Sequence, residues 1–536
     1  MATSQSESST VAGRVMDSVI DIAVVGAGPA GLSAAVAAAE AGAIVALIDA
    51  EAAPGGQFWR HPADNPGDAT SLDNTVSAAE VAPLHHGLRQ YRALRRKLAG
   101  QIAAGRVTYF ARHEVWAVER VERVERLETE RVEIGRINLA SAESVSSGAR
   151  FAVHAMTHTS AAQHEVTIRA RSLVLATGAY DLQLPFPGWD LPGVMTAGGV
   201  QSLLKGHAVV AGRRVAVAGT GPFLLSVAAG LAKSGATVVG VFDAASPRGW
   251  LRHPFAMVSA GTKLFEGAGY AAELAKRRIG YHSGWTVIQA DSADGGADVD
   301  TVTVAPISPD GSPDSARSRT IKIDVLAVGW GFVPQLELAL ALGCRTKADV
   351  SGVPIAVVDG RQRSSEPGVY IAGEICGVGG AALAVVEGEL AGLIAAAEVS
   401  GDRAAQHLAD HMMTRRLVHL AQRRTSLRTF ANAMAHVYPV PYGWSNRLPD
   451  ETVVCRCEEV TAGEIRDVVR RDGVSDARSA KLLARPGMGW CQGRVCGYAT
   501  ECLTAAEAGV TPCHRATERP VALPIRMGLL DRDESE

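Results

Sequence analysis

IDIAVVGAGPAG, residues Ile20–Gly31, is an apolar run that leads into a glycine turn. An alanine-rich segment follows, and a second apolar run then ends at Asp49. Gly26 permits the tight turn, Gly28 lets a pyrophosphate reach the helix N-terminus, and Gly31 allows the helix to pack closely on the strand. Asp49 can accept hydrogen bonds from ribose hydroxyls. The stretch therefore predicts a dinucleotide-binding βαβ unit.

A glycine-rich loop follows this unit within a few residues. Pro54–Gln57 reads PGGQ and resembles the flavin-contacting loop of the glutathione-reductase-like flavoproteins. The resemblance implies that FAD occupies this first site. The residues expected to contact it are Gly26, Gly28, Pro29, Ala30, Gly31, Asp49, Ala50, Gly55, Gly56 and Gln57.

Two later segments favour FAD over NAD at the first site. Arg171–Gly178, RSLVLATG, resembles the flavoprotein crossover back to the FAD domain. Val369–Gly377, VYIAGEICG, resembles the second flavin signature, in which an acid at a strand end binds the ribitol before a flavin-facing helix. Glu374 stands at the acidic position, where the family more often has Asp. These resemblances add Ala176, Thr177, Gly178, Gly373, Glu374 and Gly380 to the expected FAD contacts.

A second strand–turn–helix pattern begins with RVAVAGTG at Arg214–Gly221. Gly219 and Gly221 take the first two glycine positions, and Leu224 stands at the third. Asp243, at the end of the next strand, disfavours NADP because a 2′-phosphate would face a carboxylate. NAD, a structural ATP or ADP, and an empty relic all stay open here. No Cys-x-x-Cys follows either glycine motif, which excludes a dithiol relay.

Four cysteines near the C-terminus form the pairs Cys455-Arg-Cys457 and Cys491-Gln-Gly-Arg-Val-Cys496. Four thiolates satisfy one [2Fe–2S] cluster. Structural zinc is the first alternative, although its paired cysteines usually stand two to four residues apart. A disulfide framework suits small secreted chains, and inert cysteines remain a third alternative.

Both halves of this region carry a resemblance to a known domain. VCRCEEVT at Val454–Thr461 and KLLARPGMGWCQGRVC at Lys481–Cys496 together resemble the bacterioferritin-associated ferredoxin type of [2Fe–2S] domain. The resemblance implies that the cluster ligands are Cys455, Cys457, Cys491 and Cys496. The other cysteines, expected to be packing residues, are Cys344, Cys376, Cys502 and Cys513.

Composition limits the function further. The net charge of −3 over 536 residues argues against nucleic acid as a partner. No apolar run approaches the length of a membrane-spanning helix. The N-terminus is polar and lacks a secretion signal, so we expect a cytoplasmic protein that meets the inner membrane, if at all, through its electron acceptor.

These patterns predict an α/β flavoprotein with two dinucleotide-binding domains of the glutathione-reductase-like type and a small C-terminal [2Fe–2S] domain. A disordered N-terminus is expected at 1–18. The FAD-binding domain is expected at 19–205 and 325–400, with the second nucleotide-binding domain inserted at 206–324. A helical linker at 401–450, the [2Fe–2S] domain at 451–515 and an extended tail at 516–536 complete the chain.

The order of these motifs resembles the FAD-containing subunits of multi-subunit bacterial amino-acid and opine dehydrogenases. The types it resembles are the A-type subunit of opine oxidase, the B-type subunit of hydrogen cyanide synthase and the alpha type of dye-linked proline dehydrogenase. Ala179–Leu204 is the most specific piece of the resemblance. It implies an electron-transfer subunit that passes electrons between FAD and the cluster. A partner flavoprotein (beta) subunit would oxidise the substrate C–N bond, a further small subunit could join, and a quinone or other carrier would accept the electrons.

Two other functions stay open. A self-sufficient NAD(P)H-dependent reductase would pass electrons through the cluster to an acceptor protein. In a regulatory protein, the cluster would sense iron or oxygen. No histidine or carboxylate stands in a catalytic pattern, so no catalytic residue is assigned.

Overall fold

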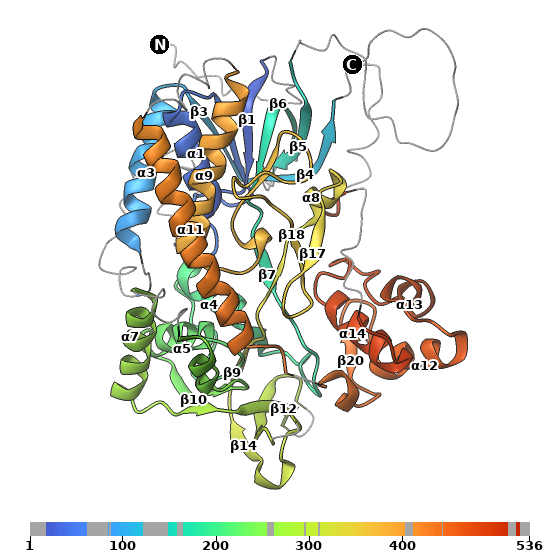
Figure 1. Cartoon of the computed structure of the whole chain (residues 1–536). Helices are drawn as coiled ribbons and strands as arrows, with labels where there is room; N and C mark the ends of the chain where they lie inside the picture. The colour runs from blue at the N-terminus through green and yellow to red at the C-terminus, as the bar shows by residue number, and fades with distance from the viewer. Residues whose placement is uncertain are drawn as a thin grey trace, which may run out of the picture.

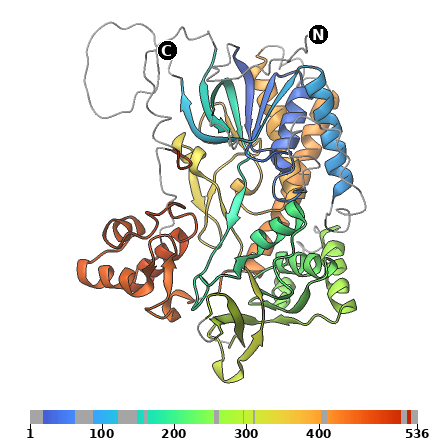
Figure 2. The ribbon, with the colours of Figure 1, turned by 180° about the vertical axis from the view of Figure 1, so that it is seen from behind.

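A computed structural model describes residues 18–61, 84, 87–121, 148–157, 164–254, 262–293, 296–308, 311–401, 411–441, 443–512 and 521–525. Figures 1 and 2 show two sheet-based bodies, one above the other, with a small helical domain at one side. Except for Ser18, the predicted disordered N-terminus lies outside the described residues, and so does Cys513.

The first sheet has seven strands in the order β3-β2-β1-β6-β5-β4, with β19 beside β6. β1, β2, β3, β6 and β19 form its parallel part, and β4 and β5 extend it antiparallel. Its central strands are buried on both faces, which explains their continuous apolar runs. The strands are β1 Ile20–Val25, β2 Val45–Asp49, β3 Val107–Ala111, β4 His113–Arg120, β5 Phe151–Thr157, β6 Glu165–Leu175 and β19 Val369–Ile371.

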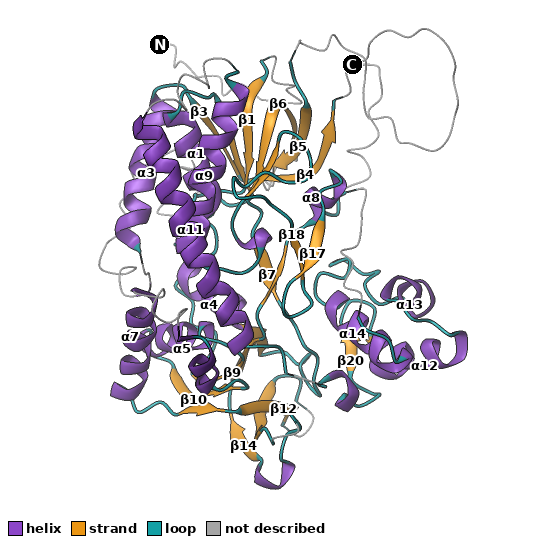
Figure 3. Ribbon diagram, viewed as in Figure 1, coloured by secondary structure: helices purple, strands orange, loops and turns teal. Residues whose placement is uncertain are grey.

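Two helices, α1 Pro29–Glu40 and α9 Ala381–Val399, pack together on one face of this sheet (Figure 3). Their close approach depends on Gly388, where a Cβ atom would lie 1.9 Å from the Ala30 carbonyl oxygen. α3, Leu88–Ala103, lies against α1.

The second sheet has five parallel strands in the order β11-β10-β9-β15-β8. β8 and β15 fall in ranges that the sequence assigns to the FAD-binding domain, yet β15 pairs with both β8 and β9. Strands this short give no pattern that shows which sheet they join, so the predicted boundaries were wrong, and we propose 194–329 for the second nucleotide-binding domain. Its strands are β8 Val194–Thr196, β9 Arg214–Gly219, β10 Thr237–Asp243, β11 Tyr281–Ser283 and β15 Val325–Gly329.

The other elements complete these two bodies. A three-stranded antiparallel sheet joins β12, β13 and β14, and smaller pairs join β7 with β16 and β17 with β18. The strands are β7 Ala179–Asp181, β12 Trp285–Ser292, β13 Val299–Pro306, β14 Arg319–Lys322, β16 Phe332–Pro334, β17 Thr346–Ala348 and β18 Pro354–Ala356. The helices are α4 Ala197–His207, α5 Phe223–Lys233, η2 Pro247–Arg252, α7 Thr262–Lys276, η3 Ser315–Arg317, α8 Glu337–Ala341 and η4 Glu374–Cys376.

The expected linker contains one long helix, α11, His411–Val437. It packs along α9 in the first body and reaches η2 in the second, as Figure 1 shows. The helical character predicted for 401–450 is present, and the helix is also a structural element that both bodies share. Its pairing with α9 depends on contacts far apart in sequence, which local composition does not reveal.

The C-terminal domain contains a β20–β21 hairpin and three helices, α12, α13 and α14. α12 begins with a capping box, in which Thr461 and Glu464 satisfy each other's backbone N–H groups. The elements are η5 Ser445–Arg447, β20 Val453–Cys455, β21 Val460–Thr461, α12 Ala462–Asp472, α13 Ala477–Ala484 and α14 Gly497–Ala508.

Of the expected tail, only residues 521–525 are described. They contain no helix or strand, and the Ala522 N–H donates to the Trp116 carbonyl at 2.7 Å. Val521, Leu523 and Ile525 pack on the cluster formed by Trp116, Ala117 and Met156. This part of the tail thus rests on the first sheet.

Within the described residues, no helix is both long and apolar enough to span a bilayer.

Candidate functional site

The first glycine turn joins β1 to α1 and brings three segments into contact. Gly26 has φ +94°, and a Cβ atom there would meet the Ala176 carbonyl oxygen at 2.4 Å. A Cβ atom on Gly31 would lie 1.7 Å from the Gly26 carbonyl oxygen. Pro29 stands in the first turn of α1, where its missing N–H costs nothing. The turn therefore keeps the helix N-terminus bare of side chains, as a bound pyrophosphate requires.

Gly31→Ala is expected to disrupt this turn and lower the FAD content of the purified protein. Overpacking of this kind costs about 1–3 kcal/mol, and here the displaced atom is backbone. The matched control is Gly100→Ala on α3, where a Cβ atom meets nothing within 4 Å. That change should raise stability by about 1 kcal/mol. Flavin absorbance per chain and thermal unfolding measure both effects, and equal FAD content in the two variants would contradict the prediction.

The PGGQ loop lies over the same turn. The Gly55 N–H donates to the Ala27 carbonyl at 2.8 Å, and the Tyr91 hydroxyl donates to the Pro54 carbonyl at 2.6 Å. A Cβ atom on Gly56 would lie 2.8 Å from the Gly28 Cα atom. Gln57 is exposed. The loop thus forms the second wall of the glycine turn, as a dinucleotide site needs.

Asp49 ends β2 beside this wall, and the exposed Ala50 follows it. Its carboxylate accepts from the backbone N–H groups of Ala27 and Glu51, the latter at 2.8 Å. Burial raises the pKa of Asp49 to about 6, which leaves it a carboxylate at neutral pH. Each carboxylate oxygen has two lone pairs, so ribose hydroxyls can still donate to it.

The crossover segment follows β6 at Ala176, Thr177 and Gly178. The Ala176 N–H donates to the Val25 carbonyl at 2.9 Å, which joins the crossover to the end of β1. The Thr177 hydroxyl donates to the Gln335 carbonyl at 2.7 Å, so it is already engaged. The carboxyl ends of β1, β2 and β6 therefore border the first site.

Glu374 follows β19, and its carboxylate faces the start of α9. Its two oxygens accept from the Gly379 and Gly380 N–H groups at 3.1 and 2.8 Å. Burial raises the pKa of Glu374. The carboxylate thus fixes the two residues that lead into the helix N-terminus that the sequence assigns to the flavin. A ribitol contact at Glu374 remains a prediction.

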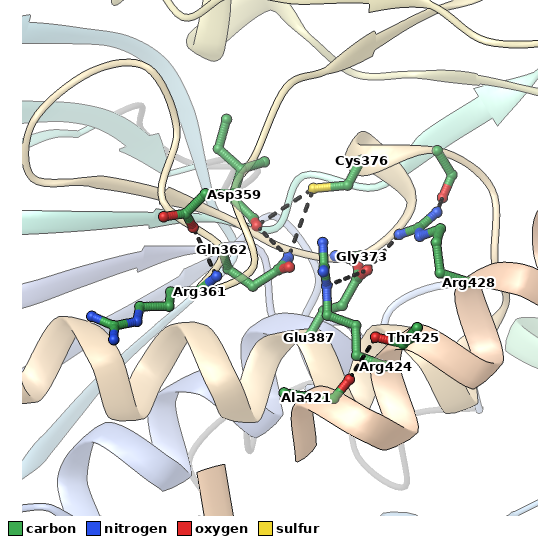
Figure 4. Close-up of polar contacts among 12 residues, drawn as sticks. Asp359, Arg361, Gln362, Gly373, Cys376, Glu387, Ala421, Arg424, Thr425 and Arg428 are labelled. Atoms are coloured by element: carbon green, nitrogen blue, oxygen red, sulfur yellow. Dashed lines mark hydrogen bonds and ion pairs between the residues drawn. The ribbon is translucent and has the colours of Figure 1, made fainter. Parts of the chain in front are cut away.

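A buried ion cluster lies beneath this turn (Figure 4). Glu387 on α9 is 0% exposed, and its carboxylate lies 2.5 Å from Arg428 Nη2 and 3.5 Å from Arg424 Nε, both on α11. Its other oxygen accepts from the Gly373 N–H at 3.1 Å. Arg428 also donates to the Gly377 carbonyl at 2.6 Å. α11 is thereby bonded to both sides of the loop that presents Glu374.

The second glycine turn lies between β9 and α5, at the carboxyl edge of the five-stranded sheet. Gly219 and Gly221 have φ values of +138° and +97°. Asp243 is buried, and burial raises its pKa. The Tyr281 hydroxyl donates to it at 2.7 Å and the Ala245 N–H at 2.9 Å. The three predicted residues meet in space, with the Gly221 N–H 3.4 Å from the Asp243 carboxylate.

The four cysteines of the C-terminal pairs come together in the small domain. Cys455 and Cys496 are buried, Cys491 is half-buried and Cys457 is exposed. A hydrogen bond from Cys496 lowers the pKa of Cys455 to about 6 and that of Cys491 to about 4. Cys457 is hydrogen-bonded to Cys491. The same hydrogen bonds raise the pKa of Cys496, the thiol that donates them, and the pKa of Cys457 is also raised. Cys455 and Cys491 are thus the two thiols that ionise most readily, and the thiolate is the form that binds a metal.

The pairing of these thiols suits a binuclear cluster, because a [2Fe–2S] centre needs two thiolates at each iron. The Gly487 N–H also donates to Cys455 Sγ at 3.3 Å, a bond that stabilises a thiolate ligand.

The loop between Cys491 and Cys496 is anchored to the body of the protein by Arg494. Its guanidinium lies 2.8 Å from Glu337 Oε1 and donates to the Tyr180 hydroxyl at 3.1 Å. It also donates to the carbonyl of Ala522 in the tail. Tyr180 lies two residues after Gly178, so the cluster loop is bonded to the segment that leaves the flavin crossover.

The hairpin that carries the first cysteine pair makes a second set of contacts. The Trp189 indole donates to the Val453 carbonyl at 2.6 Å. Arg456, between Cys455 and Cys457, lies over the Trp189 ring and donates to the Asp190 carbonyl at 3.1 Å. The segment Ala179–Leu204, the most specific part of the sequence resemblance, therefore holds the small domain in place.

Comparison with known families decides the classification. Residues 20–388 match the family described as pyridine nucleotide-disulphide oxidoreductase. The chain belongs to this family. This pyridine nucleotide-disulphide oxidoreductase homologue has an additional C-terminal domain, because residues 453–505 match the BFD-like [2Fe-2S] binding domain. The predicted fold class is confirmed, and the chain is an FAD-dependent oxidoreductase with a [2Fe–2S] domain.

Relatives of this pyridine nucleotide-disulphide oxidoreductase cover nearly the whole chain. Hydrogen cyanide synthase subunit HcnB of Pseudomonas protegens is 31% identical over 90% of this chain and 92% of its own length. The A-type subunit of opine oxidase from Agrobacterium tumefaciens is 30% identical over 95% of this chain and 91% of its own length. The L-proline dehydrogenase of P. horikoshii shares the fold, with a TM-score of 0.59 and 19% identity over 96% of this chain and 80% of that one. The predicted resemblance is confirmed.

Sequence reasoning missed three residues of the site: Arg494, Glu387 and Arg428. Arg494 stands inside the Cys-x4-Cys loop, where a lone cation among glycines could have drawn notice. Glu387 lies among apolar residues in the first half of α9, and a buried acid of this kind needs a cation. Its partners stand on another helix, beyond the reach of a local pattern.

Proposed function

We propose that this chain is the electron-transfer subunit of a hetero-oligomeric amine or amino-acid dehydrogenase. FAD exchanges electron pairs and a [2Fe–2S] cluster single electrons, so a chain that holds both can convert one into the other. Gly26, Gly28, Gly31 and the PGGQ loop would hold the FAD diphosphate. Cys455, Cys457, Cys491 and Cys496 would hold the cluster.

One observation carries the proposal: Arg494 bonds the cluster loop to Tyr180 and Glu337. Tyr180 lies two residues after Gly178 in the flavin crossover, and Glu337 is the first residue of α8. Two independent domains joined by a flexible tether would not need such an anchor. A fixed contact between the cluster loop and the strand ends at the first site is what electron exchange between two cofactors requires.

The substrate side of the proposal rests on the relatives. Hydrogen cyanide synthase subunit HcnB and the A-type subunit of opine oxidase are both named as subunits of a larger enzyme. The name of the second also includes the word opine. We propose that a partner flavoprotein subunit oxidises the CH–NH bond and that a quinone or another carrier accepts the electrons. A cytoplasmic location is part of the proposal, and it suits Cys344, Cys376 and Cys502, the described cysteines outside the cluster pairs, which form no disulfide.

Reconstitution tests this proposal. The chain expressed alone should contain FAD and iron yet oxidise amines, proline or opines poorly, because its described residues include no assigned substrate base. Co-expression with the proposed partner flavoprotein subunit should raise dye-linked oxidation by about a hundredfold or more, as expected when a missing catalytic partner is supplied. Full amine oxidation by the isolated chain would contradict the proposal.

A self-sufficient NADH-dependent reductase is the alternative. Gly219, Gly221 and Asp243 stand where such an enzyme would bind its nucleotide. Two side chains argue against it, because the Tyr438 ring lies against Gly221 and the Tyr281 hydroxyl donates to Asp243.

A further inference from the structure

The two glycine turns of this chain differ in what covers them. At Gly28, in the first turn, an added Cβ atom would have only the Gly56 Cα within 4 Å, at 3.9 Å. At Gly221, in the second turn, the nearest atoms to such a Cβ are the Cβ and Cγ of Tyr438, at 3.8 and 3.9 Å. Backbone without side chains borders the first turn, whereas an aromatic side chain lies against the second.

Tyr438 follows the last residue of α11 and is held from several sides. Its hydroxyl accepts from the Trp250 indole at 3.3 Å. The Trp250 ring stacks on Phe430 with centroids 5.3 Å apart, and Val437 packs against Gly249. Burial, together with the nearby charge of Asp243, raises the pKa of the Tyr438 hydroxyl. The side chain therefore lies against Gly221, the position of a pyrophosphate, and within electrostatic range of Asp243, the position of a ribose.

The groups that a dinucleotide would use are also engaged within the chain. Asp243 accepts from Tyr281, from the Ala245 N–H and, at 3.4 Å, from the Gly221 N–H. Pro222, like Pro29 in the first turn, has no N–H to offer a phosphate. The Leu224 N–H donates to the Gly221 carbonyl at 3.2 Å. The Tyr281 hydroxyl on Asp243 is the clearer difference from the first turn, where Asp49 accepts from two backbone N–H groups.

We propose that Tyr438 is a specificity-determining residue that closes the second nucleotide site to nicotinamide dinucleotides. The ring occupies the approach to the glycine turn, and Trp250 and Phe430 hold it there. The chain then receives its electrons from another protein and not from NADH. Side chains of this chain alone close the site, so the inference does not depend on which substrate a partner protein oxidises.

Titration of the FAD- and cluster-loaded protein with NADH tests the inference. The readouts are NADH fluorescence for binding and anaerobic bleaching of the flavin for hydride transfer from the nicotinamide C4 to flavin N5. Wild type should show no saturable binding in the micromolar range. Tyr438→Ala should bind NADH at least about tenfold more tightly, a change that corresponds to about 1.4 kcal/mol. Tyr438→Phe should behave as wild type, because the ring and not the hydroxyl fills the space.

Tight NADH binding by wild type would overturn the inference without any variant, so a variant that fails to fold leaves the test intact. A folded, flavin-containing Tyr438→Ala protein that still excludes NADH would also overturn it. Binding by wild type without bleaching defeats this inference alone, whereas binding with rapid bleaching also defeats the proposed function. Failure of the partner reconstitution defeats only the proposed function.

Discussion

Cys496→Ser is expected to abolish the iron–sulfur cluster while FAD stays bound. Cys496 is buried at the start of α14 and is hydrogen-bonded to both Cys455 and Cys491. A serine hydroxyl at this position does not ionise at neutral pH and replaces a soft ligand by a hard one. Iron and acid-labile sulfide should fall from about two each per chain to near zero. Dye-linked activity with the partner flavoprotein should fall by about a hundredfold or more.

The matched control is Cys502→Ser, on the same helix but outside the two pairs. Burial raises the pKa of the Cys502 thiol to about 12, and its side chain is hydrogen-bonded to Tyr498. This variant should keep iron, sulfide and activity near wild-type values. Loss of the cluster in the control, or its survival in Cys496→Ser, would show that the ligand set is wrong.

Glu387→Gln is expected to lower the free energy of unfolding by about 3–5 kcal/mol, because it leaves buried arginines without a counter-charge. Arg428 is 19% exposed and Arg424 18% exposed, so water screens neither fully. The Gly373–Gly380 turn should loosen with them, since Glu387 accepts from the Gly373 N–H. Urea unfolding followed by FAD fluorescence measures both effects, and FAD should dissociate at lower urea concentration than in wild type.

Glu389→Gln provides the comparison on the same helix, two residues away. Glu389 pairs with Arg416 at 2.7 Å, and the two side chains are 24% and 40% exposed. An ion pair of this kind contributes about 0–1 kcal/mol. Similar unfolding curves for the two variants would mean that the Glu387 cluster does not stabilise the flavin-facing turn.

Local motifs predicted the parts of the site that depend on neighbours in sequence. The turn at Gly26–Gly31 and the start of α9 at Gly380 follow from backbone rules that a few residues satisfy, so their positions could be read directly. The contacts of Arg494 with Tyr180 and of Glu387 with Arg428 join segments far apart in the chain. No periodicity specifies such pairs, and only the folded arrangement reveals them.

The second nucleotide site shows the same limit of prediction from sequence motifs. Gly219, Gly221 and Asp243 were predicted to meet, and the structure brings them together. The sequence left the occupant of this site open, because Tyr438 stands some two hundred residues away, after a helix predicted only as a linker. A motif defines the backbone of a site, whereas the side chains that cover it come from elsewhere in the fold.

The central claim is that one chain holds FAD and a [2Fe–2S] cluster in electronic contact. Anaerobic reductive titration of the purified protein, followed by electron paramagnetic resonance, tests it most directly. Wild type should take up about three electrons per chain, two at FAD and one at the cluster, with the signal of a reduced [2Fe–2S] centre. Uptake of about two electrons, with zinc in place of iron and no such signal, would contradict the account.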